Sequence, residues 1–146
     1  MRKYLVLFFI MILSVLTCAG CKALEGNGDD NGNDVINVVG TWIFTNVLQS
    51  DENASHTRRF TLAGDENSGT VTESISPTTG TYTVTGTQFI MNLTNQDPLH
   101  FWTYEYEGTI IDNDNMSGTS KTTTYTPDGV EVEAVFDYNF TAERQQ

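Results

Sequence analysis

The chain has 146 residues, a length that favours one domain with a hydrophobic core of its own. Acidic residues outnumber basic residues 19 to 7, which gives a formal charge of −12 and makes nucleic acid and anionic lipid surfaces poor partners. Aromatic residues make up 11% and hydrophobic residues 38% of the chain, and these proportions argue against a wholly disordered protein.

The first residues are typical of a secretory signal. Arg2 and Lys3 form a basic start, and residues 4–16 form an apolar run that is too short to span a bilayer. Removal of this leader would take away two bases and no acid. Five bases would then face 19 acids, so the mature protein would carry a charge of −14.

Both cysteines follow the leader, in the stretch TCAGC that ends at Cys21. This stretch resembles the bacterial lipobox, in which small residues precede a cysteine that is lipidated and becomes the mature N-terminus. Cys18 stands where the motif usually has an aliphatic residue. The resemblance implies a signal peptide over residues 1–20, a lipid on Cys21, and attachment to the membrane of the bacterial cell envelope through this lipid. We expect this membrane to be the outer membrane.

Two alternatives to a lipidated Cys21 remain open. The leader could be cut before Cys18, although Thr17 then occupies a position that prefers a smaller residue. The Cys-x-x-Cys pair could also be redox-active or form half of a zinc site. A zinc site would need further ligands, and only His56 and His100 offer imidazoles elsewhere in the chain. No metal is therefore expected.

Residues 21–37 are rich in Gly, Asn and Asp, a composition that predicts a flexible acidic linker between the lipid and a domain over residues 38–146. In that domain, apolar and polar residues alternate in short runs separated by turn residues, as in antiparallel strands. The predicted strands are residues 40–48, 56–63, 70–76, 81–85, 87–94, 100–111, 116–124 and 130–142.

The phase of the alternation predicts one buried and one wetted face of a sheet. The last run is the clearest case, because residues 130–142 alternate Val, Val, Ala, Phe, Tyr, Phe and Ala with mainly acidic or polar residues. Short connections favour up-and-down order, and eight such strands can close on themselves and leave no edge. We therefore predict an all-β fold, an eight-stranded antiparallel up-and-down barrel, with a β-sandwich as the alternative.

The segment VVGTW at the start of the first strand resembles the Gly-x-Trp signature of lipocalins and the related avidin-type barrels. The resemblance implies that Trp42 lies at the closed base of the barrel, with Arg144 from the end of the last strand packed across it. The segments GTYTVTGTQFIMNLT and YEGTIIDNDNMSGT also resemble hairpins of lipocalin-like domains in bacterial envelope lipoproteins. The usual central Thr-Asp-Tyr motif and final helix are absent from this sequence.

In such a barrel, alternate connections form one open mouth, where ligands enter. The inward residues expected near that mouth are Asn46, Arg58, Leu93, Trp102, Tyr104 and Val132. The deeper walls are expected to come from Phe44, Phe60, Met91 and Phe136. Arg58 would bind a ligand carboxylate or lie at the rim with its aliphatic stem over Trp102. An eight-stranded barrel holds either its own side chains or one small ligand, so pocket and packed core remain alternatives.

Catalytic patterns are not evident: we find no Ser-His-Asp order, nucleophile elbow or closely spaced carboxylate pair. We therefore expect no enzyme and no cofactor. The sequence predicts a lipid-anchored, lipocalin-like barrel that binds a small, partly apolar ligand. The alternative is a filled barrel that acts as a structural or protein-interaction module, such as an inhibitor.

Overall fold

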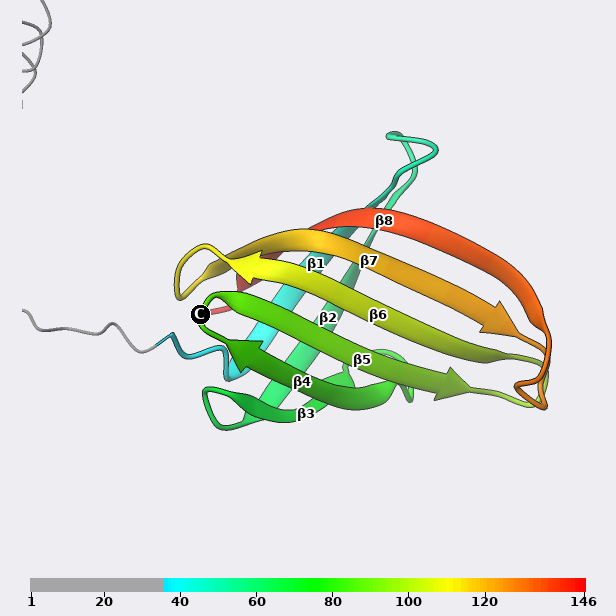
Figure 1. The fold of residues 1–146 in the computed structure, drawn as a ribbon, viewed down its shortest axis with the longest axis horizontal. Helices are drawn as coiled ribbons and strands as arrows, with labels where there is room; N and C mark the ends of the chain where they lie inside the picture. Colours follow the sequence, from blue (N-terminus) through cyan, green and yellow to red (C-terminus); the bar gives the residue numbers. More distant parts are fainter. Residues whose placement is uncertain (1–35) are drawn as a thin grey trace, which may run out of the picture. The chain divides into compact units, whose positions relative to one another are not determined.

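The computed structural model describes residues 36–146, and these residues form a closed antiparallel barrel (Figure 1). Its strands are β1 (Gly40–Leu48), β2 (Ser55–Gly64), β3 (Ser68–Glu73), β4 (Thr79–Thr85), β5 (Gln88–Gln96), β6 (Phe101–Ile110), β7 (Asn115–Tyr125) and β8 (Val132–Arg144). Each strand pairs with its neighbours in sequence, and β8 pairs with β1 to close the sheet. The predicted up-and-down barrel is confirmed over the sandwich. The expected leader and Cys21, and all but the last two residues of the expected linker, lie outside the described residues.

Two turns show how local sequence sets the strand ends. The third strand ends at Glu73 rather than at residue 76, because the chain turns before Pro77 and the Glu73 amide donates to the Thr78 carbonyl at 3.0 Å. Between β4 and β5, Gly86 and Thr87 form a two-residue hairpin loop closed by the pair Thr85–Gln88. Gly86 takes a φ of 59°, the left-handed conformation that such tight hairpins favour at this position.

Threonine residues recur on the outward phase of the strands. One row of register partners runs around β1 to β7 and consists of a threonine on every strand: Thr41, Thr61, Thr72, Thr79, Thr94, Thr103 and Thr123. All but the buried Thr123 are exposed or half-buried. The β-branched side chain is stiff in the extended conformation, and its hydroxyl tolerates water, so threonine suits the wetted face of a strand. This composition favours strand formation without adding charge.

The strands are strongly staggered around the barrel. Starting at Gly40 and following register partners leads through Leu62, Val71, Gly80, Leu93, Tyr104, Thr122 and Phe136. Phe136 lies two residues before Tyr138, the partner of Leu48, and is therefore level with Ser50. The circuit thus returns to β1 ten residues beyond its start. Such a stagger tilts the strands against the barrel axis and raises the far ends of β7 and β8 toward one rim.

Aromatic rings fill the middle of the barrel. The Phe44 ring lies 5.2–5.3 Å between centroids from the rings of Phe60, Tyr106 and Phe140, and 6.4 Å from that of Phe89. Edge-to-face and tilted pairs at these distances add to the stabilisation from burial of the rings. Met91 and Leu93 are also buried, at 0% and 2% exposure. The interior at this level is therefore a packed core.

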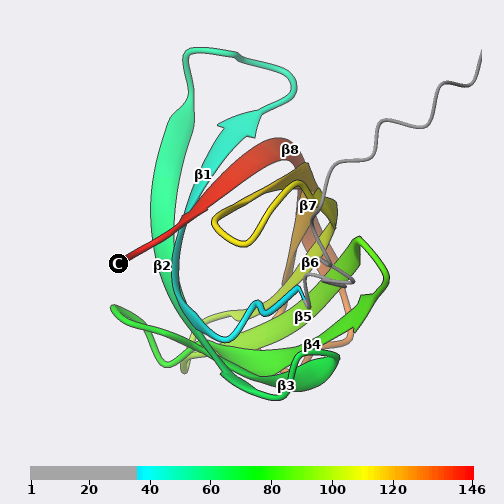
Figure 2. The same cartoon turned by 90° about the vertical axis from the view of Figure 1, so that its left-hand side faces the viewer.

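The segment before β1 covers one end of the barrel. Figure 2 shows residues 36–39 crossing that end before the chain enters β1. Val38 is buried there at 1% exposure, and Ile36 packs against the core. The backbone N–H of Asn37 donates to Oδ1 of Asn113 in the β6–β7 turn at 3.3 Å. This end, which we call the base, is closed by the chain itself.

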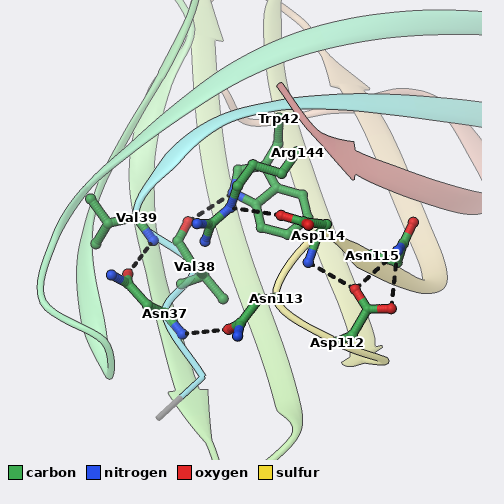
Figure 3. A network of polar contacts seen from close by, with 9 residues as sticks. All are labelled: Asn37, Val38, Val39, Trp42, Asp112, Asn113, Asp114, Asn115 and Arg144. Carbon is green, nitrogen blue, oxygen red and sulfur yellow. Dashed lines mark hydrogen bonds and ion pairs between the residues drawn. The ribbon is translucent and has the colours of Figure 1, made fainter. Parts of the chain in front are cut away.

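Trp42 and Arg144 meet at the base (Figure 3). They are register partners on β1 and β8, and the guanidinium carbon of Arg144 lies 5.1 Å from the centroid of the Trp42 ring. The fully buried Trp42 donates its indole N–H to the Val38 carbonyl at 2.8 Å. Asp114 lies 3.9 Å from Nε of Arg144. The structure thus brings together the two side chains that the lipocalin resemblance pairs.

Candidate binding site at the open end

The end opposite the base carries the longer connections. The β1–β2, β3–β4, β5–β6 and β7–β8 loops all lie there, and Figure 1 shows the β5–β6 and β7–β8 loops side by side. This arrangement follows from up-and-down order, because every second connection returns at the same end. The sequence predicted these loops to form the mouth. We call this end of the barrel the open end.

A buried ion pair lies below the open end. Nε and Nη2 of Arg58 on β2 donate to Oε1 and Oε2 of Glu73 on β3 at 2.8 and 2.6 Å. The two side chains are only 10% and 8% exposed. Glu73 also accepts a hydrogen bond from Ser76, and Ser76 lies 2.5 Å from the hydroxyl of the buried Thr78. The β3–β4 turn therefore wraps the carboxylate with hydroxyl groups.

The ion pair keeps both of its members charged. Burial opposes the charged form of Arg58 and is the largest single influence, but the hydrogen bond to Glu73 and the electrostatic attraction of Tyr106, Tyr104 and Glu73 together outweigh burial and raise the pKa of the guanidinium. Burial likewise favours neutral Glu73, yet the hydrogen bonds from Arg58 and Ser76 hold the pKa of this carboxyl below its usual value. The Arg58 guanidinium also lies over the Tyr104 ring at 3.8 Å, a cation–π contact. Arg58 therefore has a fixed partner and a fixed position.

Beside this pair, Asn46 is buried at 1% exposure near the end of β1. Its Oδ1 accepts a hydrogen bond from Ser120 on β7 at 3.0 Å, whereas its amide nitrogen has no hydrogen-bond partner. Tyr106 is close to Asn46 and Arg58. Burial raises the pKa of the Tyr106 hydroxyl to about 12, and both neighbours act against that rise. The level below the open end is thus polar, in contrast to the aromatic core beneath it.

Aromatic side chains surround these polar groups. Trp102 and Tyr104 are half-buried on β6, and the Trp102 ring lies 5.0 Å from the ring of His100. Tyr138 on β8 is half-buried as well and meets His56 edge-to-face at 5.1 Å. The open end therefore offers ring surface to solvent over a polar floor.

Phe136 does not lie where the sequence predicted. We expected it on a deep wall beside Phe44, but its side chain is 42% exposed. The cause is the stagger of the sheet: Phe136 is level with Ser50, beyond the end of β1, and so lies at the rim. Alternation along one strand fixes the face of a residue but not its height in the barrel.

Val132 also departs from the prediction, which placed it inside near the mouth. Its side chain is 58% exposed. The register between β7 and β8 shifts after the pair Thr124–Ala134, so that Tyr125 faces Val132. A β-bulge of this kind places one extra residue in a strand and reverses the alternation beyond it. Val132 therefore shares the outer face with Tyr125.

Four side chains at the open end were missed by the sequence prediction: Glu73, Thr78, Tyr106 and Ser120. Three of them had a readable signal. Glu73 alternates with buried Val71, Tyr106 alternates with Tyr104 on the inward phase, and Ser120 follows buried Met116 and half-buried Gly118 at the same spacing. Thr78 lies in a turn, where alternation does not apply. Glu73 is the partner that an inward Arg58 required.

A separate hollow of about 430 Å³ lies on the outer face of the sheet and includes Asn92, Glu105, Glu107 and Lys121 in its lining. These side chains are exposed and point away from the core. A smaller hollow of about 160 Å³ lies outside the open end, between Phe101 and the β7–β8 loop. Neither hollow reaches the Asn46 amide or Arg58.

Within residues 36–146, no three His, Cys, Asp or Glu side chains are grouped so that they could hold a metal ion. Asp112 and Asp114 lie in the β6–β7 turn, where Oδ1 of Asp112 accepts the Asp114 amide at 2.8 Å, so Asp112 stabilises the turn itself. The same part of the chain contains no helix long and apolar enough to cross a membrane.

Comparison with known proteins identified no relative: no protein-family model, curated protein or solved structure matches the chain.

Proposed function

We propose that this chain is a lipid-anchored lipoprotein of the bacterial envelope whose lipocalin-like barrel binds a small, partly apolar molecule at its open end. The anchor rests on the sequence: a basic and apolar leader followed by the lipobox-like stretch that ends at Cys21. The lipocalin-like character rests on the Gly-x-Trp segment and on the contact between Trp42 and Arg144 at the base. The rest of the proposal concerns the open end.

One observation carries the binding function: the open end combines exposed ring surface with a buried polar group that has no partner. Trp102 and Tyr104 offer ring surface that is half-buried, and below them the Asn46 amide nitrogen makes no hydrogen bond. Small-molecule sites have this composition, with apolar and aromatic walls and a few convergent polar groups that fix orientation. A buried donor without a partner costs free energy, and a ligand acceptor would remove that cost.

The packed core limits how deep the ligand lies. The rings around Phe44 fill the middle of the barrel, and the Arg58–Glu73 pair lies directly above that level. The ligand would therefore occupy the upper part of the barrel and contact Trp102 and Tyr104, whereas Met91 and Leu93 would support the site from below. A ligand in this position must be small, and part of it remains at the mouth.

A second function, a protein-interaction module with a filled barrel, is favoured by a different observation. Large aliphatic side chains are exposed on three loops of the open end: Ile75 at 88%, Leu99 at 70% and Val130 at 74%. Exposed apolar groups gathered at one end of a domain are a feature of protein-binding surfaces. In this case the loops, and not the interior, would hold the partner.

Tryptophan fluorescence separates the two functions, because the chain has one tryptophan at each end of the barrel. In the Trp42→Phe variant, Trp102 is the sole tryptophan, and a ligand at the open end should shift or quench its emission. In the matched control Trp102→Phe, only Trp42 at the base remains, and the same ligand should leave its emission unchanged. The compounds to titrate are a long-chain alcohol, an isoprenoid alcohol and a substituted naphthalene. Unchanged emission of Trp102 with all three would contradict small-molecule binding and leave the interaction module.

A further inference from the structure

The charge state of the ligand can be inferred from the polar groups below the open end; this inference rests on the proposed binding function. Two buried polar atoms there have no hydrogen-bond partner, the Asn46 amide nitrogen and Oδ1 of Asn95 on β5, and Asn46 is the more deeply buried residue of the two. The Asn46 amide has two N–H groups and no partner, since Ser120 occupies only its oxygen. The one carboxylate at this level, Glu73, already accepts from Arg58 and Ser76. A ligand group that satisfies the Asn46 amide must therefore be an acceptor.

The site has no unbalanced positive charge to offer to an anion. Arg58 is the cation at this level, and both oxygens of Glu73 neutralise it at 2.6–2.8 Å. A ligand carboxylate next to Asn46 would place a second anion in a poorly solvated region that already contains Glu73. Burial of an unpaired charge costs far more than burial of a neutral acceptor that receives one hydrogen bond. The electrostatics thus favour a neutral acceptor over an anionic one.

We propose that the bound molecule is neutral, with an aromatic or isoprenoid body against Trp102 and Tyr104 and one carbonyl-type oxygen that accepts a hydrogen bond from the Asn46 amide. The body matches the half-buried rings at the open end, and the oxygen matches the donor without a partner. Fatty acids and other carboxylates are excluded by this arrangement, although their apolar chains would suit the rings.

Three naphthalenes with different substituents at one ring position test the inference: acetyl, isopropenyl and carboxylate. The acetyl and isopropenyl compounds have nearly the same shape, and a CH₂ group replaces the oxygen in the second. We expect the full chain in lipid nanodiscs, corrected for partition into empty nanodiscs, to bind the acetyl compound about tenfold more tightly than the isopropenyl compound, as one hydrogen bond to a buried donor predicts. The carboxylate should bind most weakly.

The variant Asn46→Leu assigns the preference to one side chain. It removes the donor and keeps a side chain of similar size, so the acetyl and isopropenyl compounds should then bind equally. The control Thr122→Val alters a half-buried hydroxyl on the inward phase of β7, and it should keep the tenfold preference. An NMR spectrum of the backbone amides of each variant verifies that the variant is folded. As a second readout on the unmutated chain, the Asn46 side-chain NH₂ resonances should move with the acetyl compound and not with the isopropenyl compound.

The outcomes separate the inference from the function on which it rests. Equal binding of the acetyl and isopropenyl compounds by the unmutated chain would overturn the inference and leave small-molecule binding intact. Tightest binding of the carboxylate would also overturn it, in favour of an anionic ligand held by Arg58. If none of the three compounds binds and none perturbs the Trp102 emission, the proposed binding function itself fails.

Discussion

The Arg58–Glu73 pair allows a quantitative test of the structure around the open end. Glu73→Gln removes the negative charge and leaves Arg58 charged in a place where its side chain is 10% exposed. Loss of one partner of a buried ion pair costs about 3–5 kcal/mol. We expect about 3 kcal/mol, the low end, because one amide oxygen of glutamine can still accept from the guanidinium. Arg58→Met should cost a similar amount, because it leaves Glu73 charged beside Ser76.

The double variant Arg58→Met/Glu73→Gln should cost about 3 kcal/mol rather than the 6 kcal/mol of two independent changes, since neither charge is then left without its partner. Urea denaturation followed by circular dichroism at pH 7 measures all three free energies of unfolding. Arg59→Met and Glu107→Gln serve as matched controls, because both side chains are exposed on the outer face and should each cost less than about 0.5 kcal/mol. Strict additivity would refute a coupled, buried pair.

The Arg58–Glu73 pair also makes the stability of the fold depend on pH. The pKa of Glu73 is lowered in the folded state, so its contribution to stability is fully present above the unfolded pKa of about 4.3. That contribution is lost as the pH falls below this value and through the lower pKa of the folded state. The unmutated chain should therefore lose more stability than Glu73→Gln between about pH 5 and pH 2. Parallel stability curves for the two proteins would mean that Glu73 does not hold its charge through Arg58.

Three further predictions concern the anchor, the base and the core. Cys21→Ser should abolish incorporation of a radioactive fatty acid and leave the leader uncut, and continued labelling would move the lipid to Cys18. Trp42→Ala should destabilise the fold by about 3–5 kcal/mol and Arg144→Ala by less. Because the two side chains touch, the double variant should lose less stability than the sum of the two single losses, and urea denaturation measures all three. Alkaline titration followed by tyrosine absorbance should show one group with a pKa near 12, and Tyr106→Phe should remove this step; an unchanged late step would contradict burial of that hydroxyl.

The strands could be predicted from the sequence because their signals are local. Alternation over five to ten residues decides which side of a strand is buried, and residues such as Gly86 mark the turns between strands. Closure of the barrel could also be predicted. Short connections favour pairing between strands that are neighbours in sequence, and an even run of amphipathic strands can remove its edges only by closing. At the base, the meeting of Trp42 and Arg144 came from a family resemblance and not from periodicity.

The stagger and the bulge could not be predicted, because both are properties of pairing between strands. Nothing within β8 indicates that Phe136 lies level with Ser50, and this placement moves it from the wall to the rim. The extra residue that turns Val132 outward arises from the shift between β7 and β8. The partner of Arg58 was missed for a different reason: Glu73 was on the inward phase, but an acidic residue is rarely assigned to an interior unless its partner is known.

The pairing of β8 with β1 has a consequence for how the chain reaches its folded state. Every other pair of strands joins neighbours in sequence, whereas this pair joins Trp42 to Arg144 and so spans nearly the whole described chain. Contacts between distant residues form slowly, because a long loop must close before they provide any stabilisation. Until β8 is in place, β1 and β7 are open edges, and the backbone groups that would pair with β8 are exposed to other chains. A chain that is made from its N-terminus carries these two edges until its last strand has emerged, so aggregation of this protein should depend on how rapidly β8 is delivered and not on the stability of the finished barrel.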